Sequence, residues 1–199
     1  MYLPPLEFFV RAYSADKIVI EACENFIKQT CRNRCSIYSA NGSINLSISL
    51  EKCRRNHLPI KDVKLSYDQP WNKIHWRAIV SAYNNSPYFM YYRSDFEKFY
   101  THEYEWLLDY NSQILALCFK LLKIEKEISF TEEYIVQYEN GSDYRNQFNL
   151  NKSSSIPLKN YSQVFDYKTG FISNLSIIDL LFNRGPDAEE YLKQHSKHY

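Results

Sequence analysis

The sequence predicts an α/β fold in which a small mixed or antiparallel sheet is packed by central and C-terminal helices. Two observations predict this class. Asn41-Gly42 stands between two runs that suit strands, and this dipeptide is the strongest short signal for a β-hairpin. Farther along, residues 107–122 repeat leucine and isoleucine at helical spacing. The 199 residues, 45% of them hydrophobic, suffice for one core, and we expect a single domain over 1–199.

The first elements are expected to be short. Proline is tolerated in a first helical turn, so Pro4-Pro5 predicts a short helix over 6–13. The β-branched run Lys17–Glu21 is typical of a buried strand. Val63-Lys64-Leu65 is a candidate for a further strand.

The hairpin is expected to have arms over 34–40 and 43–50. In the second arm Ile44, Leu46 and Ile48 alternate with polar residues, which predicts that these three side chains face the core. A slip of one residue would expose the whole apolar set, so the register should be well specified.

The second half of the chain is predicted to be helical. Pro70 and Ser86-Pro87 bracket a helix over 71–83. Ser94 and Glu97 have capping-box spacing, which predicts a helix that starts at Ser94, ahead of the long helix. Residues 139–160 are polar and predict a loop. A compact helix over 175–183, ended by Gly185-Pro186, and a short polar helix complete the chain.

Composition excludes several functional classes. The net charge of +1 gives no field that would steer the protein to nucleic acid or to a membrane. No run approaches the roughly 20 apolar residues of a membrane span, and the first residues lack the pattern of a secretory signal. Five cysteines without a repeated spacing suit free thiols in a reducing cytosol, so a cytoplasmic location is expected. No dinucleotide or phosphate-loop motif is present, and no cofactor is expected.

A basic segment is the first candidate site. Lys28, Arg32 and Arg34 lie within seven residues, next to Asn33. If residues 32–35 are extended, both arginines point to one face, where two planar guanidiniums suit a phosphate or carboxylate. The alternatives are a solvated strand face or arginines paired with structural carboxylates.

Buried polar residues on the predicted helices are the next candidates. Trp71 and His75 share one helical stripe, where His75 is either a general base or a satisfied core histidine. Asn111 faces inward on the long helix and either contacts a ligand or fastens a neighbouring loop. Asp179 lies on an apolar helix, so it needs a partner or water. We expect Asp179 to pair with Arg32 or Arg34, or to share a wet pocket with them.

The cysteines offer weaker chemistry. Cys31, Cys35, Cys53 and His57 have spacings that invite a zinc site. In a strand, however, Cys31 and Cys35 would be roughly 13 Å apart, too far to share one metal, so no metal and no disulfide are expected. Cys35 as a thioester-forming nucleophile is a further alternative, without a histidine beside it in the sequence.

Several segments resemble the WbqC-like protein family. They are spread over nearly the whole chain: residues 3–9, the basic block 28–35, 71–77, 81–83 with 86–89, Asp109-Tyr110-Asn111 and 174–183. The resemblance implies a role in bacterial surface-polysaccharide (O-antigen) metabolism, including amino-acyl (glycine-type) transfer to amino sugars. The chain resembles a short form that lacks the α/β segment of longer members before residues 174–183.

The resulting expectation is an amide-forming transferase whose ligand is a small anion such as a sugar phosphate or nucleotide sugar. His75 and Asp179 would be catalytic, and the substrate would be bound by Lys28, Arg32, Asn33, Arg34, Trp71, Asn111 and Asn174. The alternative is a non-enzymatic binding or assembly protein with the same pocket. A common cleft for His75, Asn111 and the arginines would favour the enzyme.

Overall fold

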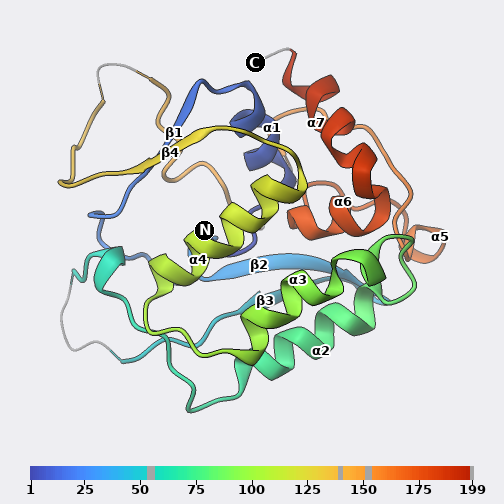
Figure 1. The fold of residues 1–199 in the computed structure, drawn as a ribbon, viewed down its shortest axis with the longest axis horizontal. Coiled ribbons are helices and arrows are strands. Elements are labelled where there is room, and N and C mark those ends of the chain that lie inside the picture. Colours follow the sequence, from blue (N-terminus) through green and yellow to red (C-terminus); the bar gives the residue numbers. More distant parts are fainter. Residues whose placement is uncertain (53–56, 139–140, 151–153, 198–199) are drawn as a thin grey trace.

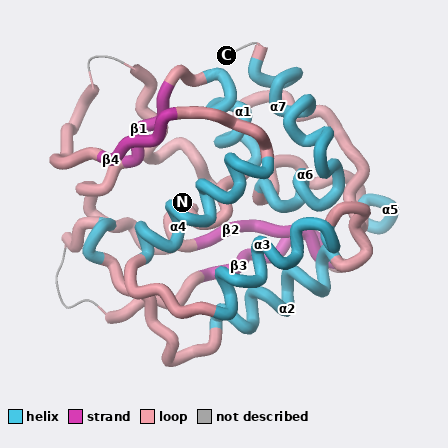
Figure 2. The backbone as a smooth tube through the Cα atoms, viewed as in Figure 1, coloured by secondary structure: helices cyan, strands magenta, loops and turns pink. Residues whose placement is uncertain are grey.

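The computed structural model describes residues 1–52, 57–138, 141–150 and 154–197. Within these ranges the strands form two separate two-stranded sheets surrounded by helices. Figure 2 shows β2 and β3 passing through the middle of the molecule, while β1 and β4 lie together at one side. The predicted α/β class is therefore confirmed, with the sheet divided into an antiparallel and a parallel part.

The central hairpin forms over the predicted segments, but its turn lies one residue earlier than the predicted Asn41-Gly42. Strand β2 (Arg34–Ser39) pairs antiparallel with β3 (Gly42–Ser47), and the loop is Ala40-Asn41. Gly42 adopts a φ of +103°, which glycine tolerates without strain. Leu46 and Ile48 are buried as predicted, but Ile44 near the hairpin tip is 38% exposed.

The second sheet joins segments that are far apart in the sequence. Strand β1 (Lys17–Ile20) pairs in parallel with β4 (Glu127–Phe130), which was not predicted. The prediction of a buried strand at 17–21 is wrong in its burial, because Val19 is 48% exposed. Residues 63–65 form no strand, and only isolated bridges link Leu65 to Leu50 and Lys64 to Trp106.

The first helices match the predictions with one exception. Helix α1 (Leu6–Ser14) follows Pro5, α2 is Trp71–Tyr83 and α4 is Leu107–Leu121. Helix α3 (Phe89–Thr101) begins five residues before Ser94, so the predicted capping box is wrong. The earlier start is set by tertiary contacts, since Tyr88 N–H donates to the Phe182 carbonyl and the rings of Phe89 and Phe182 pack edge to face.

The C-terminal part consists of a loop and three helices. Helix α5 (Asp166–Thr169) is a single turn, α6 is Ile177–Arg184 and α7 is Ala188–Ser196. The predicted helix over 175–183 is thus confirmed, although it starts later, at Ile177, and ends at Arg184, directly before Gly185. The described part of 139–160 is loop, as predicted.

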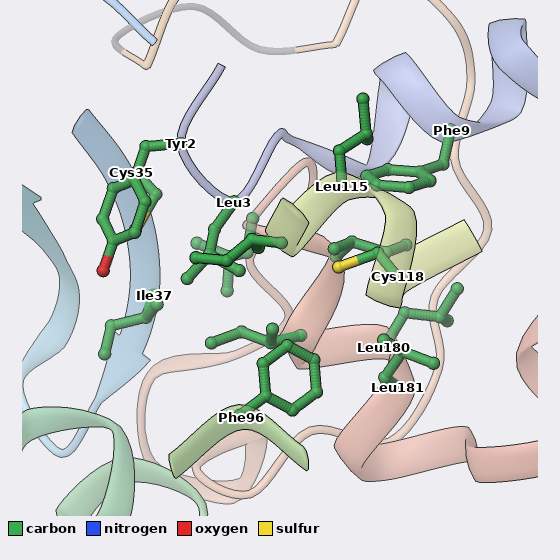
Figure 3. Packing of buried hydrophobic residues seen from close by; sticks show 14 of the residues in the cluster. Tyr2, Leu3, Phe9, Cys35, Ile37, Phe96, Leu115, Cys118, Leu180 and Leu181 are labelled. Atoms are coloured by element: carbon green, nitrogen blue, oxygen red, sulfur yellow. The ribbon is translucent and has the colours of Figure 1, made fainter. Parts of the chain in front are cut away.

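One hydrophobic core joins the elements. Figure 3 shows Cys118 of α4 near Leu180 and Leu181 of α6, with Phe9 of α1 above them, while Ile37 of β2 lies on the other side of the cluster. Helices α2 and α6 both contact β2, and α1 lies against α6 and α7, as the ribbon in Figure 1 shows. This core places the C-terminal helices and the central hairpin in direct contact. No helix in the described ranges is both long and apolar enough to cross a membrane.

Candidate functional site

The predicted basic segment does not form one anion-binding face. The chain turns between Thr30 and Asn33, and β2 begins only at Arg34, so the premise of an extended segment is wrong. Arg32 is buried and binds Glu24 through two hydrogen bonds, 2.6 Å from Nε to Oε1 and 2.5 Å from Nη2 to Oε2. This guanidinium is therefore occupied by a structural carboxylate, one of the alternatives that the sequence left open.

The other members of the basic segment point elsewhere. Arg34 donates to Ser47 Oγ at 3.2 Å across the hairpin, and Lys28 is exposed. Asn33 is buried and donates from Nδ2 to the Ile48 carbonyl at 3.3 Å. These contacts organise the turn and the hairpin.

His75 lies in a buried aromatic cluster. Its Nδ1 is 3.0 Å from the Tyr2 hydroxyl, which also contacts the Tyr100 hydroxyl at 2.9 Å. The Trp71 ring packs edge to face on His75, and Trp71 Nε1 donates to the Ser66 carbonyl at 3.0 Å. Burial lowers the pKa of His75 from 6.5 to about 4, so the imidazole stays neutral at pH 7. His75 thus has the contacts of a satisfied core histidine.

Asn111 fastens the turn that carries Arg32. Asn111 is 2% exposed, and its Nδ2 donates to the Arg32 carbonyl at 2.8 Å. In the described part of the chain, the side-chain oxygens of Asn111 and Asn33 have no hydrogen-bond partner. The amide therefore has the loop-fastening contact that the sequence analysis left as one alternative.

Asn174 has a structural contact at the start of α1. Its Oδ1 accepts the N–H of Glu7 at 2.9 Å, which satisfies a donor that the helix leaves free. Glu7 in turn accepts hydrogen bonds from Arg11 and from Ser154 and Ser155. This network ties the polar loop to α1.

The buried thiols are poor nucleophiles. Cys31 and Cys35 are buried, and burial raises the pKa of each thiol, that of Cys35 most strongly. A thioester role for Cys35 is disfavoured because the reactive thiolate would have to form inside the core. Cys53 lies outside the described residues, and the described ranges contain no cluster of three or more candidate metal ligands.

Asp179 is held by neutral donors and not by an arginine. It is fully buried, and its Oδ2 accepts the Tyr161 hydroxyl at 2.6 Å and Gln163 Nε2 at 2.7 Å. Among the described residues it forms no ion pair, so the predicted contact with Arg32 or Arg34 is wrong. Burial raises the pKa of Asp179 from 3.8 to about 6, although the hydrogen bonds from Tyr161, Gln163 and Tyr83 oppose that rise.

A pocket opens directly beside this carboxylate. It has a volume of about 540 Å³, and its lining is mainly polar. The lining residues are Asn160, Tyr161, Ser162, Asp166, Phe171 and Arg184. Tyr161 is shared, since it lines the pocket and donates to Asp179. These lining residues were not among the predicted site residues, because irregular loop sequence carries no periodic signal.

A second hollow lies at the start of α4. Its volume is about 520 Å³, and it is lined by Ala22, Lys61, Asp62, Trp106, Leu108, Asp109, Ser112 and Phe130. None of the residues predicted to bind substrate or to act in catalysis lines either hollow. His75, Asn111 and Arg32 are all buried, and none of the three lines either of these two hollows. Of the predicted catalytic residues, Asp179 alone contacts a pocket wall within the described ranges.

Comparison with known proteins gives a family and one curated relative. The model of the WbqC-like protein family matches residues 1–152, so Asn174, Asp179 and the pocket beside Asp179 lie beyond the matched part. The uncharacterized protein Rv1507c of Mycobacterium tuberculosis is 23% identical over 218 residues, which cover 96% of this chain and 94% of that protein. No solved structure matches the chain.

Proposed function

This chain belongs to the WbqC-like protein family, and we propose, from the lining of the pocket beside Asp179, that it binds a small anionic sugar derivative there. A sugar phosphate or a nucleotide sugar has the required chemistry. The family resemblance implies that this ligand belongs to bacterial surface-polysaccharide metabolism.

The main support for the proposal is that the guanidinium of Arg184 has hydrogen-bond donors available in the pocket. This guanidinium lines the pocket, and its charge opposes the rise that burial causes in the pKa of Tyr191. Among the residues that the structure describes, it forms no ion pair and no hydrogen bond. The other arginines that were candidates, Arg32 and Arg34, are bound to Glu24 and Ser47. A planar guanidinium offers paired donors to a phosphate or carboxylate, and Arg184 is available to make those bonds.

The remaining lining suits the sugar part of such a ligand. Phe171 and Tyr161 supply aromatic rings, 5.2 Å apart between centroids, beside the polar side chains of Asn160 and Ser162. Ligand sites commonly combine apolar surface with a few polar groups that fix orientation. The lining combines rings, hydroxyl, amide and guanidinium with the Asp166 carboxylate. It fits a polar ring whose anionic group lies at Arg184 and whose hydroxyls face Asp166.

Amino-acyl transfer at the same pocket is the second candidate, and one observation favours it. The Asp179 carboxylate, with its pKa raised to about 6, is hydrogen-bonded to Tyr161 in the pocket wall. When an amine nitrogen bonds to an acyl carbon and the leaving group departs, the amine proton must be taken up, and Asp179 would receive it through the Tyr161 hydroxyl. His75 and Cys35 have no part in this version, because both are buried away from the pocket.

The test is a ligand-dependent shift of the melting temperature, measured for the intact chain and for Arg184→Gln. We expect nucleotide sugars or sugar phosphates to raise the melting temperature, while free neutral sugars do not. Loss of a hydrogen bond to a charged group costs about 1.5–3 kcal/mol, so Arg184→Gln should weaken binding by about tenfold or more.

The matched control is Arg77→Gln, which removes an exposed arginine of α2 outside the pocket. This variant should bind as the unaltered chain does. The proposal fails if no anionic sugar derivative binds, or if Arg184→Gln binds as tightly as the unaltered chain. Mass spectrometry of the same mixtures, supplied with an activated amino acid and an amino sugar, separates transfer from binding alone, since only transfer yields the amide.

A further inference from the structure

The loop that forms the pocket is connected to the core through one ionisable side chain. Asp179 lies in the first turn of α6, and its carboxylate is fully buried. Its two closest donors, the Tyr161 hydroxyl and Gln163 Nε2, both come from the segment 160–172, which also supplies Asp166 and Phe171 to the pocket. The helix therefore reaches the pocket wall through hydrogen bonds to that segment.

Gln163 extends this connection along the segment. Its Nε2 donates to the Ile172 carbonyl at 2.9 Å, and its Oε1 accepts the Ile172 N–H at 2.9 Å. The N–H of Gln163 donates to Asp166 Oδ2 at 3.0 Å. Ile172 follows Phe171, so one amide side chain joins Asp179 to the backbone next to the second aromatic wall.

We propose that Asp179 is a positioning residue that holds Tyr161 directly, and Phe171 through Gln163 and Ile172, in the arrangement that forms the pocket. The inference rests on the proposed function, because the wall that Asp179 would hold in place is the wall of the proposed ligand pocket. Asp179 does not line the pocket, so it acts through these neighbours and not by touching the ligand.

The physical reason is the cost of leaving buried polar groups without partners. If the segment 160–172 moved away, the buried carboxylate would lose two short hydrogen bonds. Leaving a buried charge without these donors would lower the free energy of unfolding considerably. Tyr83 of α2 faces the same carboxylate, but it belongs to the core and does not line the pocket. The C-terminal end of the segment 160–172 has a second contact with the core, because the hydroxyl of Tyr38 in β2 donates to the Gly170 carbonyl.

The test measures backbone hydrogen exchange in the segment 160–172 of the ligand-free protein. Asp179→Ala and Gln163→Leu should each speed exchange of these amides by about tenfold or more, because each variant removes at least one hydrogen bond to a buried partner. Asp179→Asn keeps an acceptor oxygen, so its exchange should remain within about threefold of the unaltered chain. Tyr161→Phe should speed the exchange of these amides in the otherwise unaltered chain. In a chain that already carries Asp179→Ala it should cause no further increase, which is the result that a double-mutant cycle gives for two groups that act through one hydrogen bond.

Gln194→Leu is the matched control for Gln163→Leu, because Gln194 is exposed and, among the described residues, its side chain bonds only to Glu190 within α7. The inference is overturned if the segment exchanges at its original rate in Gln163→Leu, or if α4 amides accelerate equally and the whole fold has loosened. If Asp179→Ala does not fold, Gln163→Leu and Tyr161→Phe decide the matter. Because no ligand is used, a failed ligand screen with local loosening would refute the proposed function and leave the positioning role intact.

Discussion

His75 illustrates how burial sets the chemistry of a single residue. The sequence left open whether this histidine is a base or a core residue. The structure surrounds it with Trp71 and the Tyr2 hydroxyl, and burial lowers its pKa to about 4. At a pH where the histidine is neutral in both the folded and the unfolded chain, its burial stabilises the fold. In acid the unfolded chain binds a proton at this histidine more readily than the folded chain does, so the free energy of unfolding falls.

We predict that His75 makes the protein less stable in acid. The folded pKa is about 4 against 6.5 in the unfolded chain, so the unfolded state binds more protons between these values. The contribution of His75 to the free energy of unfolding is complete above pH 6.5 and falls by roughly 3 kcal/mol as the pH approaches 4. His75→Gln, which can still bond Tyr2, should remove this contribution, so in urea unfolding curves between pH 6.5 and 4 the variant should lose roughly 3 kcal/mol less stability than the unaltered chain.

The control for that measurement is His102→Gln, at an exposed histidine in the loop after α3. It should leave the pH dependence of the urea midpoint as it is in the unaltered chain. An unchanged slope between pH 6.5 and 4 in His75→Gln would show that His75 is already protonated or solvated in the folded protein.

At the scale of an element, the end of α6 depends on one glycine. Gly185 follows Arg184 with a φ of +54°, a conformation that L side chains adopt at a cost. A Cβ at this position would overlap Cδ1 of the Tyr88 ring. Both the turn of the backbone and the close approach of the ring thus require glycine here.

Gly185→Ala should therefore destabilise the protein by roughly 2–4 kcal/mol, the sum of backbone strain and displacement of Tyr88. Urea unfolding gives the measurement. Gly42→Ala is the comparison. Gly42 also has a positive φ, +103°, but no atom lies within 4 Å of the added Cβ. This variant therefore has the backbone strain without a steric clash. Equal losses in the two variants would mean that the Tyr88 ring moves away at no cost.

At the scale of the whole molecule, two buried titratable groups oppose each other. Asp179 has a folded pKa of about 6 against an ordinary 3.8, so the folded state binds the extra proton in this window. Its stability contribution rises as the pH falls from 6 to about 4, the reverse of the contribution from His75. The two changes are each roughly 3 kcal/mol and nearly offset each other.

We predict that Asp179→Asn exposes the acid sensitivity that Asp179 masks. Between pH 6 and 4 this variant should lose roughly 3 kcal/mol more stability than the unaltered chain, because only the His75 contribution remains. Chemical unfolding at pH 4.5 and 7 measures the difference. Parallel pH profiles for the two proteins would show that Asp179 titrates near its ordinary value in the folded state.

Elements that depend on neighbouring residues could be predicted from the sequence. Helix α2 has the predicted bounds because prolines bracket its run, and the hairpin forms because Asn41-Gly42 suits a tight turn. The long helix α4 follows from its apolar spacing. In these cases the residues that specify the structure lie within a few positions of one another.

Only the tertiary structure decided the partners of the buried groups. Strand β1 pairs with β4 across more than 100 positions, Arg32 binds Glu24 rather than Asp179, and Asp179 binds a loop with no periodic signal. A buried charge takes whichever donors or acceptors packing brings within about 3 Å, and the sequence pattern specifies that it needs a partner but not which one. The same limit hid the pocket, because its wall is built from an irregular loop and the last turn of α6, and only their packing brings Arg184 beside Tyr161.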